Sequence, residues 1–180
     1  MKATGIVRRI DDLGRVVIPK EIRRTMRIRE GDPLEIYTNS DGEVIFKKYS
    51  AINEMSDNAV HVADIMCKLA GCPVVIFDKD HVVASSGVSR KEFSERRVTV
   101  QLEELMESRS QYFRTPDNNT RFFGAEGVEK AAVAAAPNIS AGDIIGAVVV
   151  LESDTSRSAT ELQKSLITAS AQFLAKQIEG

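Results

Sequence analysis

The N-terminal segment most constrains the fold, because it is patterned as strand, tight turn, strand and short helix. In a strand over residues 6–10, the period of two places Ile6, Arg8 and Ile10 on one face and Val7 and Arg9 on the other. Gly14 completes an Asp-Leu-Gly turn, where glycine can adopt a positive φ without steric cost. Pro19 suits the first turn of a helix, in which Ile22 and Met26 share one side. The basic residues of that helix fall elsewhere on its circumference.

This segment is also strongly basic, in a chain whose formal net charge is −2. Residues 2–29 hold nine Lys and Arg residues against three acidic ones, a charge of +6, and seven of the nine are arginine. Residues 51–180 hold 13 basic and 18 acidic residues. Guanidinium groups bind phosphate in bidentate pairs and read guanine edges. The segment therefore favours nucleic acid as a partner over the alternative of an ordinary solvated charged face.

Residues 2–49 resemble the AbrB family of swapped-hairpin transcription regulators. The similarity is carried by residues 5–25, by Gly31-Asp32-Pro33-Leu34-Glu35-Ile36-Tyr37 and by Val44-Ile45-Phe46-Lys47-Lys48-Tyr49. The family contacts DNA through arginines of the first hairpin, its turn and the helix. The resemblance implies that double-stranded DNA is the partner and that six residues bind it: Arg8, Arg9, Arg15, Lys20, Arg23 and Arg24. With its C-terminal extension, the chain is similar to members that activate and repress sporulation genes in endospore-forming bacteria.

Residues 1–50 are too short to fold as a stable monomer. A second hairpin is expected from residues 34–38 and 43–47, around an Asn-Ser-Asp-Gly turn. Units below about 55 residues usually need a disulfide, a metal or a partner chain, and no cysteine lies in this segment. We therefore expect a dimer, and the resemblance adds that the hairpins interleave between two chains into a β-barrel. Twofold symmetry would place each arginine twice on one surface.

Residues 51–55 are expected to link this domain to a second one at 56–180. Apolar residues follow at spacings of three and four, and they are Ile52, Met55, Ala59, Val62, Met66 and Leu69. The spacing predicts a helix over residues 50–72 that ends at Gly71. Such a helix either packs on its own sheet or forms a coiled coil with a symmetry mate. We expect it to do both, so that dimers of the first domain assemble into a tetramer.

Residues 73–180 are patterned as an α+β domain. The apolar run 73–78 predicts a central strand, and residues 81–87 predict the strand that returns beside it. A helix, an irregular segment, two more strands and a long final helix are expected at 98–109, 110–130, 131–137, 144–152 and 158–178. This element order resembles that of GAF domains, with the PAS fold as the near alternative. The resemblance implies a GAF-like α/β domain for assembly or small-molecule sensing, or else a purely structural dimerisation domain.

An effector pocket, if the domain is a sensor, is expected between the sheet and the irregular segment. The side chains that we expect to line it are Tyr112, Arg114, Arg121, Phe122 and Phe123. No cyclic-nucleotide or chromophore motif accompanies the GAF resemblance, so the sequence does not identify an effector.

The sequence lacks the patterns of enzymes, metal sites and exported proteins. It contains no G-x-S-x-G, Walker A, G-x-G-x-x-G or H-E-x-x-H motif, so we expect a non-enzyme without a cofactor. Cys67 and Cys72 do not complete a zinc site with His61 and His81, and are expected to be buried or half-buried free thiols, with a redox role as the alternative. No signal peptide or membrane span is apparent. We expect a cytoplasmic, nucleoid-associated protein.

Two functions remain after these exclusions. The first is a DNA-binding transcription regulator whose C-terminal domain assembles or senses. The second is an antitoxin-type DNA-binding protein, because the same hairpin module also occurs with a C-terminal segment that clamps a toxin. Such segments are usually short and disordered before binding. The long, patterned C-terminal part of this chain favours the first function.

Overall fold

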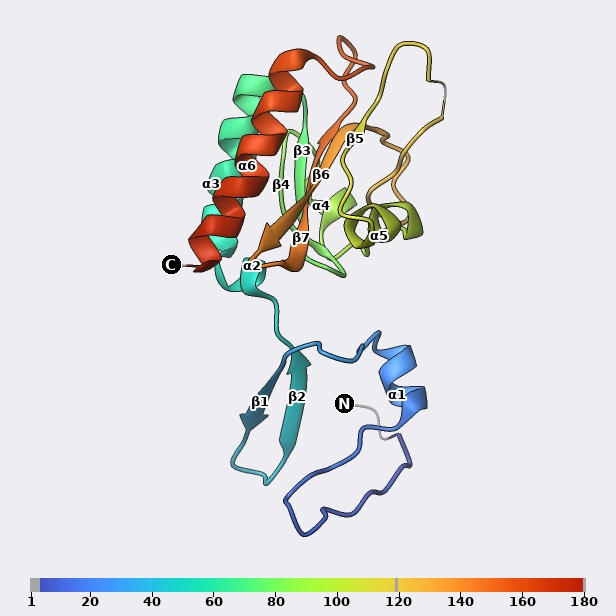
Figure 1. The fold of residues 1–180 in the computed structure, drawn as a ribbon, viewed down its shortest axis with the longest axis vertical. Coiled ribbons are helices and arrows are strands. Elements are labelled where there is room, and N and C mark those ends of the chain that lie inside the picture. The colour runs from blue at the N-terminus through green and yellow to red at the C-terminus, as the bar shows by residue number, and fades with distance from the viewer. Residues whose placement is uncertain (1–3, 119, 180) are drawn as a thin grey trace. The chain divides into compact units, whose positions relative to one another are not determined.

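A computed structural model describes residues 4–118 and 120–179, and the chain divides into two compact units at Tyr49 (Figure 1). We call residues 1–49 the N-terminal unit and residues 50–180 the C-terminal unit. Helices and strands occur in both units, so the chain has the mixed α+β character that its sequence predicts.

The N-terminal unit contains one short helix and one two-stranded hairpin. Helix α1 spans Lys20–Thr25, and strands β1 (Leu34–Thr38) and β2 (Val44–Lys48) pair antiparallel. In the turn between the strands, the Asn39 side chain accepts hydrogen bonds from the backbone N–H groups of Asp41 and Glu43. The second predicted hairpin is therefore confirmed.

The first predicted hairpin has its turn but not its strands. The Gly14 N–H donates to the Asp11 carbonyl at 3.0 Å, and the Asp11 N–H donates to the Arg15 carbonyl at 3.1 Å. On either side of this turn, residues 5–10 and 15–18 are extended without strand pairing (Figure 1). The prediction of two paired strands is wrong for a single chain, because these segments lack a continuous ladder of backbone partners within it.

The N-terminal unit has almost no interior. Among its described residues, Pro19 alone is buried. Its exposed large apolar side chains are Ile6, Val7, Ile10, Leu13, Val16, Val17, Met26, Ile36, Tyr37, Val44, Phe46 and Tyr49. Folding costs conformational entropy that must be offset mainly by burial of apolar surface. One copy of this unit does not bury enough apolar surface to be stable alone.

The C-terminal unit is organised on a five-stranded antiparallel sheet with strand order β4-β3-β7-β6-β5. The strands are β3 (Val74–Phe77), β4 (Val82–Ser86), β5 (Tyr112–Phe113), β6 (Ala132–Ser140) and β7 (Asp143–Leu151). The apolar run of β3 is fully buried, as expected of a strand covered on both faces. Strands β6 and β7 meet at a two-residue turn in which Ala141 and Gly142 both have positive φ, the geometry that suits a tight hairpin.

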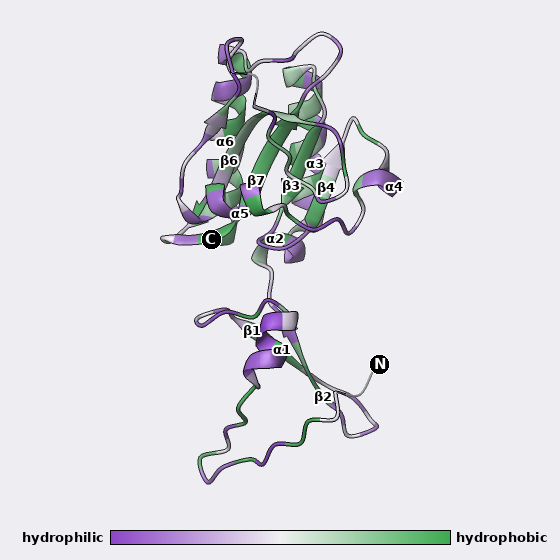
Figure 2. Ribbon diagram, turned by 90° about the vertical axis from the view of Figure 1, so that its right-hand side faces the viewer, coloured by the Kyte–Doolittle hydropathy of each residue, from purple (hydrophilic) through white to green (hydrophobic). Residues whose placement is uncertain are grey.

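Helices cover both faces of this sheet (Figure 1). They are α2 (Ala51–Glu54), α3 (Ser56–Ala70), α4 (Arg90–Phe93), α5 (Val100–Glu107) and α6 (Glu161–Glu179). One core cluster joins Ala63 and Met66 of α3 to Ile167 of α6 and to the sheet. The other joins Leu102 of α5 and Phe122 of the irregular segment to the opposite face. Figure 2 shows the apolar central strands in green between these layers.

The helix predicted for residues 50–72 is interrupted at Met55, and residues 51–55 are not a linker. The Ser50 hydroxyl accepts a hydrogen bond from the Asn53 N–H at 3.2 Å and caps α2. Ile52, which is only 1% exposed, belongs to the core of the C-terminal unit. The linker prediction is wrong because this isoleucine anchors α2 to that core.

Helix α3 packs on its own sheet, as one of the two predicted arrangements requires. Ala59 and Met66 of the predicted apolar seam are buried, together with Ala63, which the heptad pattern left off the seam. Leu69, the last residue of that seam, is 56% exposed and does not contribute to the core. Packing on the sheet is thus confirmed, and the coiled coil with a second chain stays a prediction.

Candidate nucleic-acid interface and a charged pocket

All six residues predicted to bind DNA are exposed in the N-terminal unit: Arg8, Arg9, Arg15, Lys20, Arg23 and Arg24. The last three lie at positions i, i+3 and i+4 of α1, so they share one face of this hydrophilic helix (Figure 2). The first three lie on the extended segment before α1, and within the described residues they share no hydrogen bond or ion pair with the helix. The structure therefore brings together three of the six within one chain.

Arg15 is held in place by Asp11 across the tight turn. Arg15 Nε donates to Asp11 Oδ2 at 2.8 Å, while the backbone N–H groups of Arg15 and Leu13 donate to Asp11 Oδ1 at 2.8 and 3.0 Å. The hydrogen bonds from Arg15, backbone and then side chain, hold the pKa of Asp11 below its usual value. The Arg15 side chain remains 68% exposed. The turn thus presents an oriented guanidinium group to solvent.

The C-terminal unit contains a charged cavity of about 610 Å³ at the ends of β5 and β7 and the start of β3. Its lining residues are Pro73, Arg114, Arg121, Lys130, Glu152, Ser153, Asp154 and Arg157. We call this the charged pocket. Arg114 and Arg121 line it as predicted for an effector site.

Tyr112, Phe122 and Phe123 were also predicted to line such a pocket, and for the charged pocket this is wrong. The rings of Tyr112 and Phe122 stack with their centroids 4.7 Å apart and pack with the second core cluster. Phe123 lies beneath the Arg121 guanidinium group, which is 5.2 Å from its ring centroid. These rings are engaged in stacking contacts and in the burial of apolar area, so they do not line the pocket. Partial burial also raises the pKa of Tyr112, against the opposing charge of Arg114.

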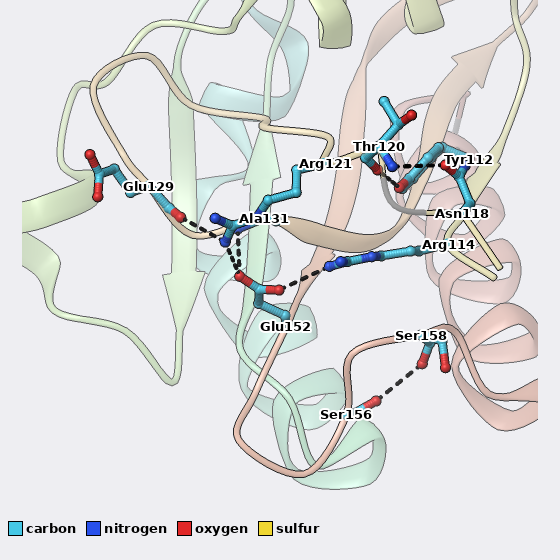
Figure 3. Close-up of polar contacts among 10 residues, drawn as sticks. All are labelled: Tyr112, Arg114, Asn118, Thr120, Arg121, Glu129, Ala131, Glu152, Ser156 and Ser158. Atoms are coloured by element: carbon cyan, nitrogen blue, oxygen red, sulfur yellow. Dashed lines mark hydrogen bonds and ion pairs between the residues drawn. The ribbon is translucent and has the colours of Figure 1, made fainter. Parts of the chain in front are cut away.

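Glu152 joins the two arginines of the charged pocket (Figure 3). Its Oε2 accepts from Arg114 Nη1 at 3.0 Å, and its Oε1 accepts from Arg121 Nη2 and from the Ala131 N–H. Arg121 Nη2 also donates to the Glu129 carbonyl at 3.3 Å. Burial acts to raise the pKa of Glu152, but the hydrogen bonds from Arg121 and Ala131 and the charge of Arg121 outweigh it. The pKa is lowered, and the carboxylate is ionised at neutral pH.

The other charged residues of this pocket are not predicted from the sequence, and they are Lys130, Glu152, Asp154 and Arg157. For two of them, the position next to the end of a strand could have predicted a place in the pocket. Lys130 comes two residues before β6 begins, and Glu152 directly follows β7. Because β6 and β7 are antiparallel neighbours, the start of β6 and the end of β7 lie side by side, and these two positions meet at the same end of the sheet.

The described residues also bear on metal, redox and membrane roles. No group of three or more His, Cys, Asp or Glu side chains among them could hold a metal ion. Cys67 and Cys72 are free thiols, half-buried and buried, as predicted. Cys72 Sγ lies 3.2 Å from Gln163 Nε2 and 3.4 Å from Ser153 Oγ. Within the described part of the chain, no helix is both long and apolar enough to span a membrane.

Both units of the chain match models of known protein families. The family model described as "Stage V sporulation protein T C-terminal, transcription factor" matches residues 54–179. The model "Antidote-toxin recognition MazE, bacterial antitoxin" matches residues 7–52. Stage V sporulation protein T of Bacillus subtilis (strain 168) is 45% identical over 179 residues, 99% of each chain. The transition state regulatory protein AbrB of the same organism is 51% identical over 76 residues, 42% of this chain and 77% of its own.

The fold of the C-terminal unit also has a solved counterpart. The GAF domain/HD domain protein from Geobacter sulfurreducens superposes with a TM-score of 0.53 at 13% identity, covering 73% of this chain and 93% of that chain. At this identity the likeness shows the fold alone, and it confirms the predicted GAF-like architecture. The first family model and the full-length relative together cover the chain almost from end to end. This chain therefore belongs to the stage V sporulation protein T family of transcription factors.

Proposed function

We propose that the protein regulates sporulation genes on the chromosome by binding duplex DNA through a dimer of its N-terminal units. The observation that carries this proposal is that one short unit combines exposed apolar side chains with exposed cationic ones. The apolar side chains need a second copy for burial, and the cations need a polyanion. The similarity of this unit to a transition state regulatory protein supports a regulatory role, and we propose no catalytic one.

A second copy of the N-terminal unit would supply the missing core. Ile10 lies across the tight turn from Val16, and the two are 69% and 46% exposed. Complete burial of such a side chain stabilises a fold by about 1.5–3 kcal/mol. The extended segments on either side of the turn also offer unpaired backbone groups to a partner strand. Interleaving of the two chains would satisfy both requirements in one β-barrel.

Such a dimer would carry the six predicted DNA-binding residues twice. Among the described residues, five of the six form no ion pair with an acidic side chain: Arg8, Arg9, Lys20, Arg23 and Arg24. Their charges are therefore available to phosphate groups. Most of the contacts would position the protein on the phosphate backbone, while a subset of arginines reads base edges or groove shape.

Salt should weaken duplex binding steeply, because each cation that neutralises a phosphate releases a counterion. If six to ten of the twelve cations of a dimer act in this way, log K falls with log[salt] at a slope of about −5 to −9. Fluorescence anisotropy with a labelled operator fragment between about 50 and 200 mM KCl measures this slope. A slope shallower than about −2 would contradict an interface built from these residues.

The C-terminal unit is proposed to join two such dimers into a tetramer. Helices α3 and α6 lie side by side on one face of the sheet (Figure 1), and Ile65, Leu69, Leu162 and Phe173 on them are 50–57% exposed. The opposite flank of α6 faces β5, where Lys164 lies 5.8 Å above the Phe113 ring. The flank with Leu162 and Phe173 therefore faces α3, and the four side chains form an apolar stripe for a second copy.

Leu69→Asp and Phe173→Asp are expected to convert the tetramer into a dimer, because a carboxylate in a buried interface must be desolvated without a partner. The stripe residues are already exposed in one chain, so the folded unit should tolerate both changes. Size-exclusion chromatography with light scattering should show the mass halved. The exposed neighbour Gln172 provides the control Gln172→Asp, which should leave the mass unchanged. Equal masses for all four proteins would rule out this stripe as the interface.

An antitoxin is the second candidate function, because an antitoxin model matches residues 7–52. Toxin-clamping segments are usually disordered before binding. Residues 50–180 instead form a folded unit with two core clusters. Limited proteolysis separates the two functions, since a resistant fragment of the C-terminal unit supports a folded regulatory domain. Such a domain is also where we place the binding of a small-molecule effector.

A further inference from the structure

We propose that the charged pocket binds a phosphorylated, non-aromatic small molecule, such as a sugar phosphate. This inference rests on the effector role proposed for the C-terminal unit, and it specifies the chemistry of the effector and the residues that bind it. The pocket volume of about 610 Å³ lies within the range of about 300–1,000 Å³ that is usual for small-molecule sites.

The charge of the pocket favours a dianion. Four cationic side chains line it, Arg114, Arg121, Lys130 and Arg157, against the two carboxylates of Glu152 and Asp154. The formal charge is therefore +2. Glu152 is shared by both Arg114 and Arg121, and within the described residues Lys130 and Arg157 form no ion pair. A concave site with excess charge of one sign concentrates ligands of the other, and a phosphate monoester carries about −1.5 to −2 at pH 7.

The arginines have donors left for such a ligand. Each guanidinium group has five N–H donors in a planar fork. Arg114 uses Nη1 for Glu152, and Arg121 uses Nη2 for Glu152 and the Glu129 carbonyl. Figure 3 shows the two arginines approaching the Glu152 carboxylate from opposite sides. Glu152 thus fixes both forks before a ligand arrives, which lowers the entropy cost of binding a tetrahedral anion.

The remaining lining argues against a nucleotide. Pro73 is the one apolar residue among the eight that line the pocket, and none of the eight is aromatic. Proteins commonly hold nucleobases by stacking them on aromatic rings or guanidinium planes, and in this proposal the guanidinium groups of the pocket are engaged by Glu152 and by the phosphate. The ring of Phe123 is already covered by Arg121. Ser153 instead offers a hydroxyl group to a polar ligand. A hydroxylated body such as a sugar therefore suits this lining better than a base.

Isothermal titration calorimetry of the full-length protein tests the inference, with glucose 6-phosphate, glucose and AMP at matched ionic strength. We expect binding of glucose 6-phosphate, weaker binding of AMP and none of glucose. Lys130→Ala and Arg157→Ala should each weaken the binding of glucose 6-phosphate about tenfold, because each removes a charge-assisted hydrogen bond. The controls Lys91→Ala and Arg90→Ala remove the same charges from α4, outside the pocket. They should leave the affinity for glucose 6-phosphate unchanged.

The inference is overturned if the parent protein fails to bind glucose 6-phosphate at about 10 mM, which corresponds to a binding free energy weaker than about −2.7 kcal/mol. It is also overturned if AMP binds more tightly, or if the pocket variants and the α4 controls lose affinity equally. Operator binding is measured on the same proteins. DNA binding that persists without glucose 6-phosphate binding would sink this inference and leave the proposed regulator intact. Loss of operator binding in the pocket variants alone would assign the pocket to the DNA surface instead.

Discussion

Arg23→Ala combined with Arg24→Ala is expected to weaken binding to operator DNA by at least about 100-fold, because a dimer loses four cations at once. A hydrogen bond between charged groups contributes about 1.5–3 kcal/mol, so the loss of even two phosphate contacts reaches this value. Both side chains are exposed on α1 and no ion pair in the described residues depends on them, so the fold should be unaffected. Fluorescence anisotropy measures the affinity, and circular dichroism and light scattering verify fold and mass.

A matched control for this pair is available in the C-terminal unit. Arg90 and Lys91 are likewise exposed neighbours on a short helix, α4. Their double replacement with alanine changes the net charge of the chain by the same amount. We expect operator affinity within about twofold of the parent, because these charges lie outside the proposed DNA-binding unit, and salt largely screens exposed charges that do not contact the DNA directly. Similar losses for both pairs would mean that net charge, and not the α1 surface, determines binding.

Ile10→Asp is expected to abolish operator binding by unfolding the N-terminal unit, although Ile10 is 69% exposed in one chain. Substitution of an exposed residue usually changes stability by less than about 0.5 kcal/mol. In a dimer whose core contains Ile10, the same change buries a carboxylate without a partner and costs several kcal/mol. The size of the stability loss caused by Ile10→Asp therefore distinguishes a monomeric from a dimeric unit. Thermal unfolding followed by circular dichroism measures it.

Val100→Asp is the control for this second experiment. Val100 is 62% exposed and opens α5, where an acidic residue interacts favourably with the helix dipole. We expect parental stability and parental DNA binding for this variant. An Ile10→Asp variant as stable as Val100→Asp would show that the N-terminal unit folds without a second copy, and the dimer proposal would fall.

Local patterns were sufficient to predict most of the C-terminal unit. The apolar run of β3, the paired strands β6 and β7 and the final helix each depend on a few neighbouring residues, and all three are present. The interruption at Met55 escaped prediction because the apolar spacing continues through it without a break. Only the tertiary contact of Ile52 with the core reveals why α2 and α3 are separate helices.

Contacts between residues far apart in the sequence were predicted less well. Arg114 and Glu152 are 38 residues apart, and nothing in either neighbourhood indicates that their side chains meet. The predicted first hairpin poses a different problem. The sequence on either side of the Asp11–Gly14 turn indicates two paired strands, and one chain does not form them. If the proposed dimer exists, that pattern describes the assembled protein. A sequence is selected in its assembled state, and a single chain shows only part of the contacts it encodes.

The near absence of an interior in the N-terminal unit, where Pro19 is the one buried residue from 4 to 49, also bears on how activity responds to gene dosage. If pairing is required for folding, the population able to bind an operator rises with the square of chain abundance at low expression. Two chains tethered through their C-terminal units would escape this dependence, because a short tether keeps its ends at an effective concentration of about 1 mM. The pairing of the C-terminal units would then set how little protein suffices to occupy the operator.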